Sequence, residues 1–358
     1  DYPLIDGVQK GCPHHILEPS ATNLVTYSEQ FDNSIWVKSN TNITANQTIS
    51  PDGTLNADLL NSSSGLSTHS VRNDTSQTVT VGQNITLSVF AKKGTHSIIQ
   101  LTAFAFGAIY ANFDLENGVV GSYSSTNASI KNYGNGWYRC SFTNIAIATS
   151  NSEIQINIAE NLQSSRNASF NALGNENLYL WGATTEQNSY PTSYIKTTTS
   201  AVTRSAETAN GAGNSTTFND SEGVLMFEGS SLANDGTSKR VGLSDGSTSN
   251  RVSLEFDETA NTLKVFVSSG GVGNGTLIYV ADNLTSFNKI AISYKLNDLK
   301  MMFNGFLVDI DTSVTAPIGL NDLSFNSGTG ALPFYGKTKQ LQYFDSALDS
   351  QQLEQLTS

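Results

Sequence analysis

The chain has 358 residues, of which 38% are hydrophobic and only 14% charged, and its formal net charge is −12 at pH 7. A chain of this length exceeds what one hydrophobic core usually serves, so two domains are expected. The acidic balance argues against nucleic acid as a partner, because phosphate binding needs clustered Lys and Arg, and against an anionic membrane surface. No apolar run approaches the roughly 20 residues of a membrane helix, so no membrane insertion is expected.

Residues 1–22 hold three prolines and no sustained hydrophobic period. They are predicted to form an extended lead-in that packs on the following domain or on a neighbouring subunit. This segment carries Cys12, whereas the second cysteine, Cys140, lies within a strand pattern. Two cysteines are too few for a disulfide framework and lack zinc-binding spacing. A single bridge and two buried thiols both fit, and the thiols are slightly favoured because a strand interior suits a small hydrophobe.

Residues 23–195 alternate and turn like a β-sandwich. Short strand patterns recur about every 8–15 residues, separated by turn residues and without a helical run between them. In chain order, the predicted strands cover residues 23–28, 43–49, 67–72, 77–81, 84–92, 97–106, 108–114, 119–123, 129–133, 137–147, 153–159 and 178–184. This spacing is typical of a sandwich or a jelly roll.

The clearest local signal in this region is the Gly-Asn-Gly sequence at 134–136, which leads directly into Trp137, Tyr138 and Arg139. Asn-Gly favours a tight hairpin turn, and the large residues after it start a strand. Three such side chains standing together also suggest a binding platform. Weighed against strand burial, the stretch is interpreted mainly as the turn and core strand that close the first sandwich.

The stretch 193–213 is rich in Thr, Ser and Ala without an apolar period, so a linker is placed over residues 196–222. A second β domain follows over residues 223–358, with predicted strands at 224–228, 251–257, 262–267, 277–280, 288–295, 300–303, 306–310 and 340–344. Asn304-Gly305 is the strongest hairpin signal of the chain. A helix over 349–356, capped by Asp349 or Ser350, is the only convincing helix. The predicted fold class is all-β: two β-sandwich (jelly-roll) domains in tandem and one short C-terminal helix.

Several stretches of the first domain carry a family resemblance. They are Asn-Leu-Val-Thr-Tyr-Ser-Glu-Gln-Phe-Asp-Asn-Ser-Ile-Trp at 23–36, Gly-Trp-Tyr-Arg-Cys at 136–140, Leu-Tyr-Leu-Trp-Gly-Ala at 178–183, Tyr-Ile at 194–195 and Ala-Val-Thr-Arg at 201–204. Together they resemble the jelly-roll modules common in tail and fibre proteins of bacteriophages. Those modules are similar to carbohydrate-binding modules of secreted polysaccharide-degrading enzymes. The likeness spans about residues 1–205, including a Gly-Cys-Pro lead-in at 11–13.

The second domain resembles laminin G or concanavalin-like lectin sandwiches, and this likeness is weaker because it depends on patterning. It rests on the strand at 224–227, the Asn304-Gly305 hairpin and the closing Phe-Asp-Ser-Ala-Leu at 344–348 before the helix. A likeness to an architecture supports a class of function and does not identify a ligand.

Together the two resemblances imply a noncatalytic fibre or decoration protein at the surface of a phage particle, attaching it to a host cell-surface glycan. Such proteins usually form homotrimers, in which several weak sites engage at once. The alternative is the noncatalytic carbohydrate-binding portion of a secreted bacterial polysaccharide-degrading enzyme. A purely structural spacer is a third interpretation.

No catalytic constellation is found: the sequence has no GxSxG, HExxH or Walker motif, and its four histidines lack the spacing of a helical metal pair. The strongest candidate is Glu255-Phe256-Asp257-Glu258, because concanavalin-like glycosidases place acid and nucleophile carboxylates on alternate residues of one strand, as Glu255 and Asp257 would be. Thr259 stands where that pattern requires a further Glu. The group is therefore interpreted as a solvated strand end, and the protein is not expected to be an enzyme.

Glycan binding would need an aromatic ring for the apolar face of a sugar and polar side chains for its hydroxyl groups. The predicted glycan-binding residues of the first domain are Trp36, Tyr110, Tyr123, Tyr138 and Arg139. Trp36 is expected to be exposed because it lies in a predicted bend at 31–36. The tryptophans at 137 and 181 lie in strands and are expected to be core residues.

A structural calcium ion is a further hypothesis, since lectin-like sandwiches often hold one. Asp235, Asp245 and Asp257 are the predicted oxygen ligands. No run of the sequence matches the spaced acidic loop of an EF-hand, and solvated acidic loops explain the same residues more simply.

Overall fold

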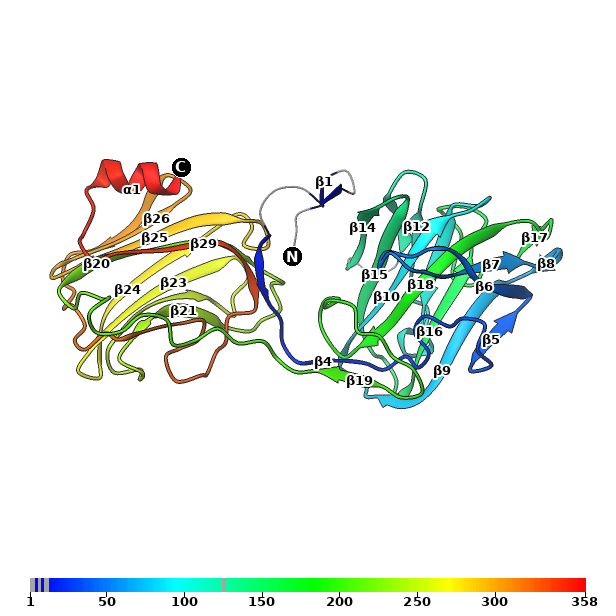
Figure 1. Ribbon diagram of the computed structural model, residues 1–358, viewed down its shortest axis with the longest axis horizontal. Coiled ribbons are helices and arrows are strands. Elements are labelled where there is room, and N and C mark those ends of the chain that lie inside the picture. Colours follow the sequence, from blue (N-terminus) through cyan, green and yellow to red (C-terminus); the bar gives the residue numbers. More distant parts are fainter. Residues whose placement is uncertain (1–3, 6–7, 10–12, 124–126) are drawn as a thin grey trace. The chain divides into compact units, whose positions relative to one another are not determined.

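The computed structural model describes residues 4–5, 8–9, 13–123 and 127–358. Over these residues the protein is all-β, with antiparallel sheets and one short α-helix near the C-terminus, which confirms the predicted fold class (Figure 1). The chain divides into two compact units. The N-terminal unit contains residues 20–205, and the C-terminal unit contains residues 206–358 together with residues 13–19.

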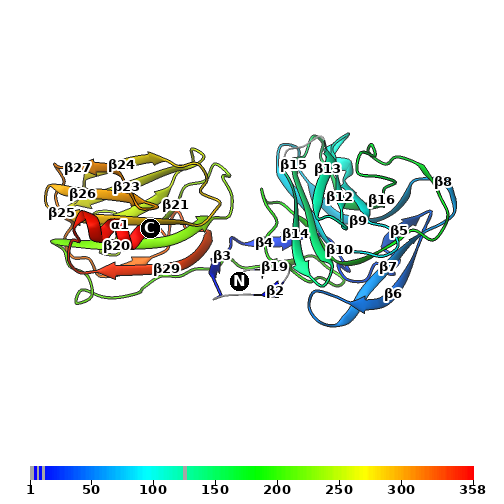
Figure 2. The ribbon, with the colours of Figure 1, turned by 90° about the horizontal axis from the view of Figure 1, so that it is seen from above.

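The N-terminal unit is built on two six-stranded sheets, seen from above in Figure 2. The β10 sheet has, in spatial order, strands β14 (Ala128–Gly134), β15 (Trp137–Ile145), β10 (Asn84–Lys93), β18 (Asn177–Glu186), β7 (Leu55–Ser62) and β6 (Thr41–Ile49). The β11 sheet has strands β13 (Val119–Tyr123), β12 (Tyr110–Asp114), β11 (Ile98–Thr102), β16 (Ser150–Ile158), β9 (His69–Val79) and β5 (Trp36–Ser39). The 3-10 helix η1 (Phe104–Phe106) and three strand pairs complete the unit: β1 (Leu4–Ile5) with β2 (Val8–Gln9), β17 (Phe170–Ala172) with β8 (Gly65–Ser67), and β19 (Val202–Arg204) with β4 (Ala21–Asn23).

The main core of this unit lies between the two sheets. Alternate residues of β10, namely Ile85, Leu87 and Val89, are buried and share one apolar cluster with Ile99 and Leu101 of β11. Burying a side chain of this size contributes about 1.5–3 kcal/mol. Because strand side chains alternate between faces, the intervening residues of β10 point to the outer face of their sheet.

Two Asn-Gly turns close hairpins where the sequence predicts them. Asn135 and Gly136, with φ of 53° and 80°, join β14 to β15. Asn304 and Gly305, with φ of 46° and 86°, join two strands of the C-terminal unit. Positive φ at both central residues is what a type I′ turn requires, and Asn and Gly adopt it most readily.

Other strand predictions are wrong. The predicted strand 23–28 is irregular beyond Asn23, whose side chain accepts hydrogen bonds from the backbone N–H groups of Val25 and Thr185, so side-chain bonds hold this segment in place of a ladder. The strands predicted at 67–72 and 77–81 are one strand, β9. β7 was missed because it contains no β-branched residue.

The C-terminal unit is also a sandwich of two sheets. The β20 sheet has, in spatial order, strands β27 (Phe306–Asp311), β26 (Asp298–Phe303), β25 (Asn288–Lys295), β20 (Glu222–Ser231), β29 (Gly336–Phe344) and β3 (His15–Leu17). The β22 sheet has strands β24 (Val272–Val280), β23 (Thr262–Ser269), β22 (Arg251–Phe256), β21 (Lys239–Ser244) and β28 (Asp322–Ser324). Its core joins both sheets through buried residues such as Leu225, Ile292, Leu254 and Val265.

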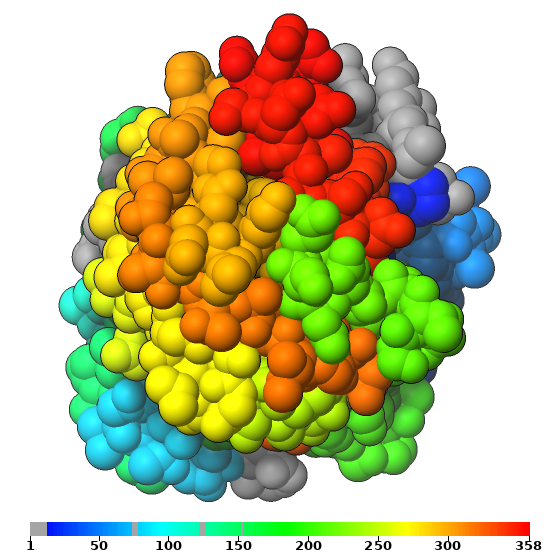
Figure 3. All heavy atoms as spheres, turned by 90° about the vertical axis from the view of Figure 1, so that its left-hand side faces the viewer, coloured from blue at the N-terminus to red at the C-terminus, as the bar shows by residue number. Residues whose placement is uncertain are grey.

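The helix α1 (Ser350–Thr357) covers part of the outer face of the β20 sheet. It starts as predicted, because Asp349 and Gln352 form a capping box in which each side chain bonds the other's backbone N–H. Leu353 is fully buried against Val224 and Met226. In Figure 3 the helix, coloured red, lies on the surface of the C-terminal unit.

The predicted lead-in and linker are divided between the two units. Within the lead-in, β3 pairs with β29 and extends the β20 sheet. Within the linker, β19 pairs with β4 in the N-terminal unit, whereas Phe218 is buried in the core of the C-terminal unit. Pairing satisfies the backbone donors and acceptors of these extended segments, which is why they do not run as free chain.

The two cysteines differ in what can be described. Cys140 is completely buried between the sheets of the N-terminal unit, and this burial raises the pKa of its thiol. Cys12 lies outside the described residues.

Among the helices of the described chain, none has the length and apolar character needed to cross a membrane.

Candidate functional site

A second apolar cluster of the N-terminal unit lies on the outer face of the β10 sheet, which we call the aromatic face. It consists of Ala57, Phe90, Trp137 and Trp181, with the partly buried Tyr133, Tyr179 and Tyr194 packed against them. The antiparallel register explains this gathering, since residues directly opposite one another share a face. Trp137 and Tyr179 flank Lys92, and in the next row Arg139 and Trp181 flank Phe90.

The rings of the aromatic face contact one another closely. Phe90 meets Tyr133 edge-on, with 4.9 Å between ring centroids, and meets Trp181 at 5.2 Å. Tyr194 lies 4.6 Å from Trp181 by the same measure. Such pairs add about 0.5–1.5 kcal/mol beyond area burial. The face is therefore a rigid aromatic surface.

A loop over residues 187–197 covers the part of the aromatic face that lies farther from the Asn135-Gly136 turn along β10 and β15. Arg139 donates to the carbonyl of Thr192 at 2.7 Å and to the Ser88 hydroxyl at 3.0 Å, and it is only 7% exposed. Thr86 donates to the carbonyl of Asn188 at 2.8 Å. Because the loop binds these polar residues directly, their part of the face is closed.

The row nearest the hairpin turn borders a pocket of about 360 Å³. Trp137 and Tyr133 provide its aromatic surface, and Lys92 and Asn135 provide polar groups. The end of β6 and the β6–β7 turn supply most of the rest; the lining is Thr48, Ile49, Ser50, Pro51, Gly53, Lys92, Tyr133, Gly134, Asn135 and Trp137. The Trp137 indole N–H donates to the carbonyl of Ile49 at 3.0 Å, which holds the ring against that turn. An aromatic wall with a few polar groups is the usual composition of a small-molecule site.

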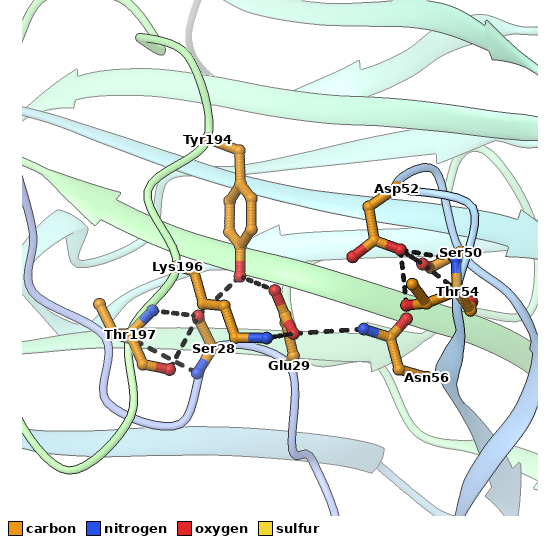
Figure 4. Close-up of polar contacts among 9 residues, drawn as sticks. All are labelled: Ser28, Glu29, Ser50, Asp52, Thr54, Asn56, Tyr194, Lys196 and Thr197. Carbon is orange, nitrogen blue, oxygen red and sulfur yellow. Dashed lines mark hydrogen bonds and ion pairs between the residues drawn. The ribbon is translucent and has the colours of Figure 1, made fainter.

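A polar network centred on Glu29 lies near the β6–β7 turn (Figure 4). Glu29 accepts hydrogen bonds from the Tyr194 hydroxyl at 3.1 Å, from Lys196 Nζ at 2.6 Å and from Asn56 Nδ2 at 3.3 Å. Tyr194 also shares a 2.7 Å bond with the Ser28 hydroxyl, and its burial raises the pKa of its phenol. The network ties a ring of the aromatic face to the segment at 28–29.

Across the space in Figure 4, Asp52 completes the β6–β7 turn. Its Oδ1 accepts from the hydroxyl of Ser50 at 2.6 Å and from the backbone N–H of Thr54 at 2.9 Å. Burial opposes ionisation, but these hydrogen bonds outweigh it and lower the pKa of Asp52. The turn that borders the pocket is thus fixed by its own carboxylate.

A smaller pocket of about 280 Å³ lies beside this network. Its polar lining includes Glu29, Asp32, Asn56, Asp58 and Lys196. Asp58 accepts from the backbone N–H of Phe31 at 2.8 Å and from that of Asn46 at 3.0 Å. Burial raises the pKa of Asp58 to about 6 despite these hydrogen bonds. The two pockets therefore differ in charge: a lysine borders the first, and carboxylates dominate the second.

Trp36 is not the exposed aromatic residue that the sequence suggested. It is 1% exposed, its ring lies 4.5 Å from that of Phe31, and its indole N–H donates to the carbonyl of Tyr27 at 3.0 Å. The bend at 31–36 folds this ring into the core between the sheets, because its large apolar surface is more stable there than in water. Trp36 is therefore a core residue.

The other predicted binding residues are not brought together either. Arg139 is closed beneath the 187–197 loop, and Tyr138, next to it, points to the opposite face and packs on the main core. Tyr110 is half-buried on the outer face of the β11 sheet. Tyr123 pairs with Ala111 in β13, and its side chain lies outside the described part of the structure.

The three predicted calcium ligands do not fit a calcium site. Asp235 forms an ion pair with Lys239 at 2.7 Å, and Asp257 forms one with Lys264. Asp245 accepts a hydrogen bond from the backbone N–H of Ser247 in its own turn. Each carboxylate is thus satisfied separately. Within the described residues, no group of three or more His, Cys, Asp and Glu side chains could hold a metal ion.

The carboxylates considered for glycoside hydrolysis are also held in ion pairs. Glu255 lies in β22 opposite Arg240 and forms an ion pair with it, and Asp257, beyond the strand end, pairs with Lys264. Burial opposes ionisation of Asp257, but the hydrogen bonds from Lys264 and Thr259 lower its pKa to about 2. A carboxyl group with this pKa is unsuited to act as a general acid.

The sequence reasoning missed Lys92, Tyr133, Tyr179 and Tyr194 as site residues, and it placed Trp137 and Trp181 in the core. Both tryptophans are buried, at 2% and 4% exposure, but in the separate cluster outside the sandwich. The alternation of side chains along a strand could have indicated the outward-facing residues. On β10 the apolar residues at 85, 87 and 89 define the inner face, so Phe90 and Lys92 must point outward.

Comparison with known proteins identifies no family. A scan against protein-family models finds no match, and neither does a search of curated protein sequences. Similar solved structures include the CBM40 domain of Ruminococcus gnavus IT-sialidase bound to α2,3-sialyllactose, with 16% identity and a TM-score of 0.35 over 42% of this chain and 94% of that one. A leech intramolecular trans-sialidase matches with 15% identity and a TM-score of 0.34, over 42% of this chain and 26% of that one. The binding domain of botulinum neurotoxin DC matches with 12% identity and a TM-score of 0.31, over 38% of this chain and 35% of that one. These are distant similarities of β-sandwich structure.

Proposed function

We propose that the N-terminal unit is a noncatalytic glycan-binding module and that the pocket beside the Asn135-Gly136 turn is its binding site. The observation that carries this proposal is the meeting of a rigid aromatic face with a pocket of about 360 Å³ that also holds polar groups. A sugar presents an apolar face to an aromatic ring and hydroxyl groups to Asn, Ser and Thr side chains. Tyr133 would contact the ring, and Asn135 the hydroxyl groups.

At the level of the whole protein, we propose a fibre or decoration protein on the surface of a phage particle that attaches the particle to a host cell-surface glycan. The support is the sequence resemblance of residues 1–205 to phage fibre modules and of residues 223–358 to lectin-like sandwiches. In this proposal the chain works as a homotrimer, and avidity multiplies a weak single-site affinity.

The alternative is the noncatalytic binding portion of a secreted polysaccharide-degrading enzyme, to which the same pocket is suited. Light scattering after size-exclusion chromatography separates the two. The fibre proposal expects a stable oligomer, and a monomer at high protein concentration would contradict it.

Glycan binding is tested by screening the full chain on a polysaccharide array and measuring hits by calorimetry. Tyr133→Ala removes a pocket ring that packs edge-on against Phe90, and we expect roughly tenfold weaker binding. Tyr110→Ala is the matched control, because it truncates a half-buried tyrosine on the outer face of the other sheet. Both variants are first checked for folding by circular dichroism. Equal losses in the two variants, or a loss confined to Tyr110→Ala, would place the site elsewhere.

A further inference from the structure

We propose that the pocket beside the Asn135-Gly136 turn selects an acidic sugar, with the ammonium group of Lys92 receiving the carboxylate of the sugar. This inference rests on the proposed function, and it adds the chemical class of the ligand. Strands β10 and β15 place two cationic side chains, Lys92 and Arg139, on the aromatic face.

Arg139 and Lys92 stand in neighbouring rows of the same face but differ in their partners. The Arg139 guanidinium is buried, donates to Ser88 and Thr192, and lies 5.4 Å from the centroid of the Phe90 ring. All three guanidinium nitrogens of Arg139 therefore donate hydrogen bonds within the fold. Lys92 is only partly buried and lines the pocket, and in the described part of the chain its ammonium group has neither a hydrogen bond nor an ion pair.

The surroundings of Lys92 hold its side chain at the pocket. It lies directly opposite Trp137 on one neighbouring strand and Tyr179 on the other, so aromatic residues flank its aliphatic stem. On the turn side, a Cβ added at Gly136 would lie 3.4 Å from Lys92 Cε, which places the stem along the turn backbone. Lysine stems commonly pack on apolar surface while the charged head stays in water.

The charge at the pocket contrasts with the rest of the protein. The chain carries a net charge of −12, yet Lys92 lines this pocket and a second cation, Lys131, lies 5.3 Å from the centroid of the pocket ring of Tyr133. The β6–β7 turn also carries a carboxylate, Asp52, which accepts its hydrogen bonds from Ser50 and Thr54 and does not line the pocket. An anionic group entering the pocket would therefore meet an ammonium group that forms no ion pair with any described residue.

These features together describe a ligand with an apolar ring face and one negative charge. A uronic acid or another carboxylated sugar has this form: its ring would contact Tyr133 while its carboxylate accepts a charge-assisted hydrogen bond from Lys92. A neutral sugar of the same shape would leave that ammonium group without its partner. Discrimination by charge follows from this difference.

The experiment compares oligogalacturonate with its methyl ester, which keeps the ring and removes the charge. Binding of each to the full chain is measured by calorimetry at low and high salt. We expect the acid to bind at least about tenfold more tightly than the ester, because hydrogen bonds to charged groups exceed neutral ones by this order. Added salt should reduce that preference, because the pocket is open to water.

Lys92→Met keeps the stem and removes the charge, so binding of the acid should fall to about the level of the ester and the preference for the acid should disappear. Lys93→Met is the matched control: its side chain is the next along β10, points to the other face and pairs with Glu116. Thermal unfolding monitored by circular dichroism verifies that both variants are folded.

The outcomes separate this inference from the proposed function. If Tyr133→Ala weakens binding but the acid and the ester bind equally, or if Lys92→Met weakens both to the same extent, the acidic-sugar inference is overturned and glycan binding stands. A sulfated oligosaccharide is included as a further probe, and tighter binding of the sulfate than of the carboxylate would also overturn the assignment. If no glycan binds at all, both the acidic-sugar inference and the proposed function are wrong.

Discussion

Each unit of the protein carries a second apolar cluster outside its main core, and the two clusters are closed in different ways. In the C-terminal unit, Val224, Met226, Ala291 and Met302 on the outer face of the β20 sheet are covered by α1 through Leu353. In the N-terminal unit, the aromatic face of the β10 sheet is covered only in part, by the 187–197 loop. A helix seals one face, whereas a loop leaves a pocket on the other.

The difference follows from the side chains that each face presents. Aliphatic side chains have no polar groups, so a helix with one apolar stripe can exclude water from them completely. The aromatic face includes Lys92, Arg139 and the hydroxyl groups of three tyrosines, which need polar partners when they are buried. A loop can supply backbone carbonyls to Arg139, but the row at the hairpin turn stays open. Function is therefore expected at the aromatic face, and α1 is expected to serve stability alone.

The largest expected effect is on the aromatic face itself. Trp137→Ala should destabilise the N-terminal unit by about 3–5 kcal/mol, because the ring is 2% exposed and its indole N–H bonds the carbonyl of Ile49. Urea unfolding combined with hydrogen exchange measures the loss and assigns it to a unit. Phe104→Ala, which truncates a ring that is 65% exposed, is the control. A Trp137→Ala protein of normal stability that only loses glycan binding would contradict the structural role of this ring.

The corresponding change in the sealed cluster is Leu353→Ala. The fully buried side chain is the main contact of α1, so the C-terminal unit should lose about 2–3 kcal/mol. Hydrogen exchange should show the loss in α1 and the β20 sheet, with glycan affinity unchanged. Gln351→Ala, on the exposed side of the same helix, should have almost no effect. A fall in glycan affinity caused by Leu353→Ala would contradict the expectation that α1 serves stability alone.

The smallest expected effect concerns pH and the carboxylate pocket of the N-terminal unit. Burial raises the pKa of Asp58 from 3.8 to about 6, so the folded state favours its neutral form. Its contribution to stability is therefore fully present below about pH 4 and is lost as the pH rises through about 6. After allowance for solvent screening, the change is on the order of 1 kcal/mol.

Asp58→Asn should remove this component of the pH dependence while keeping the shape of the side chain. The measurement is the difference in free energy of unfolding between the wild-type protein and the variant at several pH values from 4 to 7. That difference should change across the interval. If the two profiles run parallel throughout, Asp58 does not titrate there in the folded protein.

Features that depend on a few neighbouring residues could be predicted from the sequence. The Asn135-Gly136 and Asn304-Gly305 hairpins, the capping box at Asp349 and the strand rhythm all follow from local φ preferences, side-chain caps and alternation. The all-β class follows in turn. Each of these signals is complete within the element that carries it, so no long-range contact is needed to read it.

Which side chains line the candidate pocket was decided mainly by the tertiary structure. Tyr133 and Trp137 lie on one local hairpin, but Lys92 and the β6–β7 turn join them only through the order of the β10 sheet, in which β10, β18 and β7 lie far from that hairpin in the chain. The same long-range packing buried Trp36, which sequence placed in an exposed bend. Local preferences can state that a residue starts a strand or a turn. The face on which a side chain lies, and the distant residues that share it, depend on strand register and strand order. The observed register and order are those that minimise the free energy of the whole sheet.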